Sequence, residues 1–264
     1  MIMKILVLGH NGMLGNVVHK YFTKQGHEIE TIGDLRWDDN KFKRAIFDSD
    51  AKYIINCIGA IHQKNYDDDY YHFLNVRLPM FLEYTGKKVL HPSTDCVFHG
   101  TIQPPQRYEK DAERDADDPY GASKAKIDKM IVDRFKNTKI IRTSIVGHEI
   151  KGFHSLLDWF LGTPDNQALN GYSNYFWNGI TTLQWCKVAE EILLKWKKAP
   201  VLTQVGSEGM HKCLLLKTMG KVYGKSNQIN EFEMETPLNK MLLSDYELPT
   251  IEQQLIELKE FYGK

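Results

Sequence analysis

Short apolar runs alternate with helix-length amphipathic stretches through the first half of the chain. Residues 5–8 are consecutive aliphatic side chains, the pattern of a strand buried on both faces of a sheet. Residues 13–25 place apolar side chains at intervals of three and four, which predicts a helix ending before Gly26. Because strands separated by helices build parallel sheets, the pattern predicts a doubly wound α/β fold. Further strands are predicted at 27–32, 53–58, 88–91 and 140–146, and further helices at 40–47, 70–84 and 120–135.

The pattern weakens after about residue 147. We expect a doubly wound domain over residues 1–147 and a smaller lobe over 148–264, some segments of which return to the first core. Ligands of such sheets bind at the carboxyl ends of the strands, so the lobe should close over that edge. The acidic run 67–69 and the charged stretch 109–118 are expected to be solvated loops. In the lobe, helices are predicted at 155–161, 182–195 and 251–261, and a loop at 162–179.

Composition narrows the class of protein. The 34 basic and 34 acidic residues cancel, and without a basic excess we expect no nucleic-acid partner. No apolar run approaches the roughly 18 residues of a membrane helix. The four cysteines are scattered and the histidines lack metal-ligand spacing, so we expect reduced thiols and no metal. These features predict a cytoplasmic globular protein.

Three glycines lie between the first predicted strand and helix. Gly9, Gly12 and Gly15 allow a sharp turn, and the helix start that follows offers free N–H groups to a pyrophosphate. In this context the turn predicts dinucleotide binding. At the end of the second strand, a carboxylate would bind the ribose of NAD and an arginine the 2′-phosphate of NADP. Both Asp34 and Arg36 are present, so these residues leave the cofactor open.

A tyrosine and a lysine are one helical turn apart at Tyr120 and Lys124. An ammonium beside a phenol lowers its pKa, which would suit Tyr120 to acid–base chemistry, although such pairs also occur as ordinary surface residues. Before this helix, an apolar strand ends in Ser93, Thr94 and Asp95. A hydroxyl there could bind a substrate carbonyl, or could merely cap a turn.

In this order, the glycine turn, the strand-end hydroxyl and the Tyr–Lys pair resemble the extended short-chain dehydrogenase/reductases. More narrowly, the chain resembles the dTDP-4-dehydrorhamnose reductase branch. The resemblance is strong to about residue 147 and patchy beyond. It rests on residues 9–15, 93–100, 119–124 and 142–147, with weaker support from 56–59, Asn75 and 177–182.

The resemblance implies an NAD(P)-dependent reductase in nucleotide-sugar biosynthesis, with NADP(H) favoured over NAD(H). Its substrate would be the 4-keto group of a UDP- or dTDP-linked 6-deoxyhexulose of the rhamnose type, and its assembly could be the homodimer common in the family. Thr94 would orient the carbonyl, Tyr120 would donate the proton, and Lys124 would bind the nicotinamide ribose and lower the pKa of Tyr120. The implied cofactor contacts are Gly9, Asn11, Gly12, Met13, Leu14, Asp34, Arg36, Cys57, Ile58, Gly59, Ala60, Tyr120 and Lys124; the implied substrate contacts are Ser93, Thr94, Asp95, Ile145 and Trp177.

Two departures bear on the substrate. Cys96 stands where the family usually has tyrosine, and Ile145 where it usually has tryptophan, which predicts a differently shaped sugar such as an N-acetylated one. Two other functions stay open. One is a cofactor-binding regulatory subunit with little catalysis, since this branch also resembles the regulatory subunit of methionine adenosyltransferase. The other is a bifunctional epimerase/reductase, with Cys96, His91 and His99 as nominal acid/base candidates.

Overall fold

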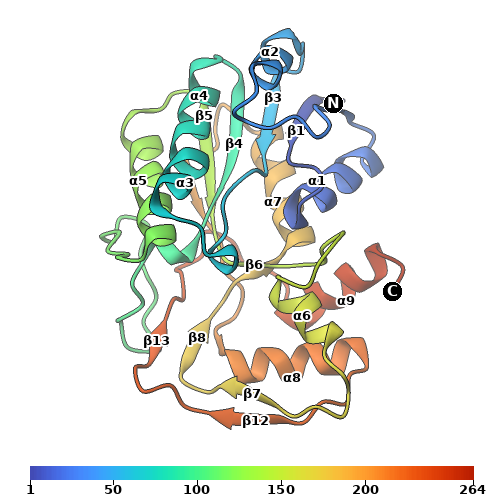
Figure 1. The fold of residues 1–264 in the computed structure, drawn as a ribbon, viewed down its shortest axis with the longest axis vertical. Helices are drawn as coiled ribbons and strands as arrows, with labels where there is room; N and C mark the ends of the chain where they lie inside the picture. The colour runs from blue at the N-terminus through green and yellow to red at the C-terminus, as the bar shows by residue number, and fades with distance from the viewer.

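A six-stranded parallel sheet forms the centre of the computed structural model, which describes residues 1–264 (Figure 1). The strand order β10-β5-β4-β3-β1-β2 confirms the predicted doubly wound α/β fold. The order reverses between β1 and β3, so a ligand crevice is expected at the carboxyl ends of these two strands. The strands are β1 (Lys4–Leu8), β2 (Glu28–Thr31), β3 (Tyr53–Asn56), β4 (Lys88–Ser93), β5 (Thr138–Arg142) and β10 (Leu202–Gln204).

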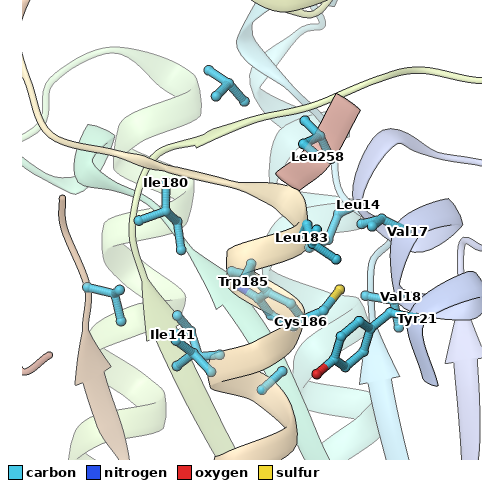
Figure 2. Close-up of a cluster of buried hydrophobic side chains, with 14 of the residues drawn as sticks. Leu14, Val17, Val18, Tyr21, Ile141, Ile180, Leu183, Trp185, Cys186 and Leu258 are labelled. Carbon is cyan, nitrogen blue, oxygen red and sulfur yellow. The ribbon is translucent and has the colours of Figure 1, made fainter. Parts of the chain in front are cut away.

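Helices cover both faces of the sheet, because successive side chains of each buried strand point to opposite faces. Ile5 and Val7 pack beneath α1 (Met13–Lys24) and α7 (Thr182–Leu194), whereas Leu6 and Leu8 pack beneath α2 (Asn40–Asp48) and α4 (Leu78–Tyr84). Alongside α4 lies α5 (Pro119–Arg134). Figure 2 shows the first core, where side chains of α1 meet those of α7, among them Leu14, Val17, Val18, Tyr21, Leu183, Trp185 and Cys186.

The helix predicted at 70–84 is interrupted by a π-helical turn. It consists of α3 (Asp68–His72), the turn η2 (Phe73–Arg77) and α4. Pro79 has no N–H to donate to the carbonyl of Asn75, which explains why regular α-helical bonding fails there. Asp67 caps α3 by accepting a hydrogen bond from the Tyr70 N–H at 2.7 Å. The acidic run therefore starts a helix, and its prediction as a loop was wrong.

The second part of the chain builds three small sheets. The segment 162–179 was wrongly predicted to be a loop. It contains the strands β7 (Leu169–Tyr172) and β8 (Tyr175–Trp177). Both are short and pair with strands far along the sequence, so the segment shows no clear alternation of apolar and polar residues. The helix α8 (Lys212–Tyr223) was also not predicted. The sheets are β11 (Met210–His211), β8 (Tyr175–Trp177) and β13 (Leu238–Asn239); β7 (Leu169–Tyr172) and β12 (Ile229–Phe232); and β6 (Ile145–Val146) and β9 (Ile180–Thr181).

Two segments of this second part pack on the central sheet. Helix α7 lies against α1, and β10 extends the sheet beside β5, while α6 (Leu156–Gly162), α8 and α9 (Ile251–Phe261) belong to the lobe (Figure 1). The lobe and the central sheet therefore share one hydrophobic core, in addition to being joined by the polypeptide chain. None of the helices has the length and apolar character needed to span a membrane.

Candidate active site

The glycine turn brings three segments into close contact. Gly9 has φ +76°, and a Cβ there would lie 2.9 Å from Cγ1 of Ile58 and 3.1 Å from the carbonyl of Cys57. A Cβ on Gly15 would lie only 2.0 Å from the carbonyl oxygen of Gly9. The two glycines therefore let β1, the end of β3 and the start of α1 meet at one point.

The start of α1 has the features of an anion site. Its N-cap is Gly12, which supplies no side-chain cap, and its first turn contains no acidic residue. The N–H groups of the first turn have no helical partner, and the helix dipole places partial positive charge there. Met13 is half-buried and Leu14 packs in the core, so these residues would offer backbone rather than side chain. This cradle fits the pyrophosphate of a dinucleotide.

Two alanine substitutions in this turn should have different effects. A Cβ on Gly12 makes only an ordinary 3.4 Å contact, so Gly12→Ala should keep its stability but weaken dinucleotide binding by about tenfold or more, ~1.4 kcal/mol, because the methyl group crowds the cradle. Gly15→Ala should lower the free energy of unfolding by about 1–3 kcal/mol because its Cβ overlaps the backbone. Denaturant unfolding and fluorescence titration with NADPH measure the two effects. Equal stability losses in both variants would contradict this assignment.

The end of β2 presents both candidate cofactor determinants. The Asn11 side-chain amide donates to the Asp34 carboxylate at 3.0 Å, which holds Asp34 beside the glycine turn. Asp34 and Arg36 are exposed, and Arg36 forms no ion pair. Both side chains can therefore face a ribose, and the geometry does not separate NAD from NADP.

The segment after β3 is fixed by Asn75. Its amide accepts from the Ala60 N–H at 2.9 Å, donates to the Ala60 carbonyl at 3.2 Å and donates to the Ser123 hydroxyl on α5 at 3.0 Å. Ala60 is thereby buried and both of its backbone groups are occupied. Of the four cofactor contacts expected here, Gly59 is exposed, while Cys57 and Ile58 are half-buried and pack on the cores.

Gly121 lets the start of α5 pack closely against the segment that follows β4. The Asp118 side chain caps α5 by accepting from the Gly121 N–H at 2.9 Å. A Cβ on Gly121 would lie 2.5 Å from the carbonyl of Cys96, in the short helix η3 (Asp95–Val97) that follows β4. Tyr120 consequently lies beside Thr94. Burial raises the pKa of Tyr120, and the Thr94 hydroxyl acts in the opposite direction by hydrogen bonding.

Lys124 is directed at β4. Its ammonium donates to the Pro92 carbonyl at 2.7 Å and lies 3.4 Å from Nε2 of His91. Burial lowers the pKa of Lys124 to about 8. The Lys124 ammonium thus faces the strand in this structure, and the Thr94 hydroxyl is the neighbouring group that acts to lower the Tyr120 pKa.

The expected substrate contacts divide into two groups. Asp95 is buried beside Thr94 and accepts from its hydroxyl at 3.1 Å, so both lie with Tyr120. The Ser93 hydroxyl instead donates to Asp128 at 2.5 Å, which turns it away from the site. Trp177 is 1% exposed within the core, because it is the inward residue of β8, and Ile145 is half-buried against the same core. In this structure Ser93 therefore faces Asp128 and Trp177 lies within the core, while Thr94 and Asp95 lie with Tyr120.

A buried ion cluster joins the site to the sheet. Asp128, one turn beyond Lys124 on α5, accepts from Arg142 at 2.6 and 3.1 Å and from Arg114 at 2.6 Å. Burial acts to raise the pKa of Asp128, but hydrogen bonds and charge from Arg142 hold it below its usual value. Because Asp128 also accepts from Ser93, the cluster ties the helix of Tyr120 to the strand of Thr94.

The three nominal acid/base candidates for epimerisation differ in placement. His91 lies 3.0 Å from the Asn56 amide and against Lys124, and burial lowers its pKa well below the usual value. His99 is paired with Asp117 at 3.1 Å. Cys96 borders the site, but burial raises its pKa to about 12, so it stays a thiol. His91 and His99 thus interact with other protein groups, Asn56 and Lys124 in the first case and Asp117 in the second.

Three further side chains border the site from the lobe. Tyr175, Lys212 and Lys240 lie close enough to Asp95 or Cys96 for their charges to interact. Sequence reasoning missed them, because Tyr175 lies in the segment predicted as loop and Lys212 begins the unpredicted helix α8. Tyr71 and His62 also flank the Tyr120 ring, at 5.9 and 6.2 Å between ring centroids.

Comparison with known proteins places this geometry in context. Residues 3–157 match the family described as RmlD substrate binding domain. None of the curated proteins matches the chain in sequence.

Solved structures are similar over the full length. A dTDP-4-dehydrorhamnose reductase from Clostridium acetobutylicum has a TM-score of 0.83 at 16% identity, covering 99% of this chain and 100% of that chain. The Bacillus anthracis dTDP-4-dehydrorhamnose reductase, in complex with NADP, has a TM-score of 0.84 at 15% identity, covering 100% and 99%. A UDP-glucose 4-epimerase from Thermotoga maritima, with UDP-glucose, has a TM-score of 0.79 at 14% identity, covering 99% of both chains. At these identities the structures establish the shared fold.

Proposed function

The chain belongs to the RmlD substrate binding domain family of NAD(P)-dependent oxidoreductases, and on this premise we propose that it reduces the 4-keto group of a nucleotide-linked 6-deoxyhexulose. The observation that carries the proposal is the placement of Thr94 beside Tyr120, with Lys124 buried one turn along the same helix. A regulatory subunit that only binds the cofactor would not need these three groups together.

Each residue of this group has a distinct proposed role. The Thr94 hydroxyl, which now donates to Asp95, would donate to the substrate carbonyl and orient it. Tyr120 would then donate its phenolic proton to the developing alkoxide. Burial keeps that phenol protonated in the resting protein, as a proton donor requires. Lys124 would hold the nicotinamide ribose. Its ammonium has three N–H donors, and the bond to the Pro92 carbonyl uses only one of them.

The dinucleotide would bind across the switch point between β1 and β3. The backbone at Gly12 and Met13 would hold its pyrophosphate, and a bound reduced nicotinamide supplies the hydride. NADPH is proposed over NADH because the reductase branch that the chain resembles favours NADP(H), and the exposed Arg36 is available to receive a 2′-phosphate. The NADP-bound reductase from Bacillus anthracis supports the same choice.

The proposed sugar is of the rhamnose type and is N-acetylated. Cys96 and Ile145 stand at the two positions named above, where the family usually has bulky aromatic side chains; Cys96 is half-buried beside the site, and Ile145 is half-buried against the core of the lobe. Their smaller volume would leave room for a substituent that the aromatic residues would exclude. The nucleotide can be UDP or dTDP.

Turnover with keto sugars tests the proposal. The purified protein is mixed with NADPH and then with UDP- or dTDP-4-keto-6-deoxyhexuloses, with and without a 2-acetamido group, while absorbance at the nicotinamide band is followed. We expect substrate-dependent oxidation, faster with the acetamido sugars and slower with NADH. Tight NADPH binding without oxidation of any of these sugars would reject the reductase and favour the regulatory alternative.

The reaction should slow in alkaline solution. Burial lowers the pKa of Lys124 to about 8, so its ammonium is present below that pH and is lost above it. Because the charged form is the one proposed to hold the nicotinamide ribose, kcat/KM for NADPH should fall as pH rises through about 8. Initial rates at varied NADPH concentration over about pH 6 to about pH 10 check this. A kcat/KM for NADPH that stays constant across this range would show that the charge of Lys124 is not needed.

A further inference from the structure

One face of a small lobe sheet carries two lysines without acidic partners. Lys212 follows β11 and lies beside Tyr175 of β8, while Lys240 follows β13 on the other side of β8. Neither ammonium forms an ion pair or a side-chain hydrogen bond, whereas Lys217 and Lys221 of the same α8 pair with Glu231 and Glu252 at 2.9 and 2.6 Å. Figure 1 places β8, β13 and α8 in the lobe below the central sheet.

Aromatic rings hold the Lys212 ammonium in place. Its Nζ lies 4.8 Å from the centroid of the Trp177 ring and 5.3 Å from that of Tyr175, both within cation–π range. Burial lowers the pKa of Lys212 to about 8, while Asp95 and Cys96 act to raise it. The ammonium is therefore charged at neutral pH, in a position where a charge is costly without a counter-ion.

The two lysines converge on the loop that carries the site. The charge of Asp95 acts on the pKa of Lys212, of Tyr175 and of Tyr120, so these three side chains lie near it. Lys240 acts on Cys96 in the same loop, and its stem lies 3.1 Å from the position of a Cβ on Gly100. The lysine-bearing face of the lobe therefore lies next to the loop that carries Asp95 and Cys96.

We propose that Lys212 and Lys240 bind the diphosphate of the nucleotide-linked sugar, which deepens the proposed function and rests on it. Two unpaired cations match the two negative charges of a diphosphate, and charge-assisted hydrogen bonds to phosphate are strong. The carboxylate of Asp95 repels that group and so directs it toward the lobe. The uncharged sugar ring then lies toward Thr94 and Tyr120. Trp177, expected from the sequence to touch the sugar, acts instead through Lys212.

Binding of nucleoside diphosphates to the whole protein tests this inference without turnover. Calorimetric titration with UDP and with dTDP should show binding to the wild type, and Lys212→Met and Lys240→Met should each raise Kd by about 10- to 100-fold. Lys212→Arg keeps the charge and should bind nearly as well as the wild type. Lys217→Met is the matched control, because it removes an α8 lysine that already has a carboxylate partner, and its Kd should not change.

The pattern of results separates the two proposals. Uridine and thymidine lack phosphate, so their weaker binding should not respond to Lys212→Met. If UDP and dTDP fail to bind, or if Lys212→Met and Lys240→Met bind them as the wild type does, the diphosphate site is overturned. If UDP and dTDP bind and both variants weaken their binding, but no keto sugar is reduced, the diphosphate site is supported and the proposed reductase activity is rejected. Reduction with an unchanged KM in both variants would reject the site and keep the reductase.

Discussion

Replacing Tyr120 by phenylalanine should lower kcat/KM by about 10²- to 10⁴-fold, the usual effect of removing a positioned proton donor. The ring keeps its place between Tyr71 and His62, and the helix cap formed by Asp118 on Gly121 is untouched. The loss should therefore fall on kcat, while the free energy of unfolding and the Kd for NADPH stay near those of the wild type. Stopped-flow reduction of a 4-keto sugar and NADPH titration measure both.

Tyr71→Phe is the matched control. It removes a phenol whose ring centroid is 5.9 Å from that of Tyr120, but whose hydroxyl donates to the Ile61 carbonyl at 3.3 Å rather than facing Thr94. We expect this variant to retain most of its activity. If Tyr71→Phe lost as much kcat as Tyr120→Phe, or if Tyr120→Phe stayed active, the proton would have to come from another group.

The parts of this site that could be predicted from sequence are those fixed by local geometry. Gly9 and Gly15 mark a turn that only glycine can make, and the apolar run at β1 leaves no alternative to a buried strand. Tyr120 and Lys124 share a helix, so their spacing alone sets their separation along it. These features depend on neighbours within one strand–turn–helix unit, which is why the pattern of apolar and polar positions was sufficient.

The parts that sequence could not show depend on contacts between distant segments. Ser93 and Thr94 are adjacent hydroxyl residues, and only the position of Asp128 decides that Ser93 faces the ion cluster while Thr94 faces the site. Strand β8 is three residues long and its register comes from β11 and β13, so Tyr175 carried no strand signal of its own. Lys212 was missed for the same reason, because it meets the rings of Tyr175 and Trp177 only once the lobe has folded.

Catalytic geometry in this chain should depend on the buried cluster at Asp128. Its two oxygens accept from Arg142, Arg114 and Ser93, and the side chains of Asp128 and Arg142 are both 0% exposed. Removing the carboxylate leaves two arginines buried or half-buried without their counter-ion. That loss costs far more than the pair itself contributes, because the desolvation of the guanidinium groups is no longer offset.

Asp128→Asn should therefore lower the free energy of unfolding by about 3–5 kcal/mol at neutral pH. Asp133→Asn on the same helix is the control, since Asp133 forms an exposed pair with Lys129 at 3.3 Å and should change stability by about 0.5 kcal/mol or less. The pKa of Asp128 is lowered on folding, so its stabilisation is complete above its usual value of 3.8 and is lost as pH falls through the folded pKa. The gap between wild type and Asp128→Asn should accordingly narrow in acid. Urea unfolding at neutral and acidic pH measures this difference in the free energy of unfolding. If Asp128→Asn lost no more stability than Asp133→Asn, the bond between Arg142 and Gln204 would be enough to hold the strand ends without Asp128.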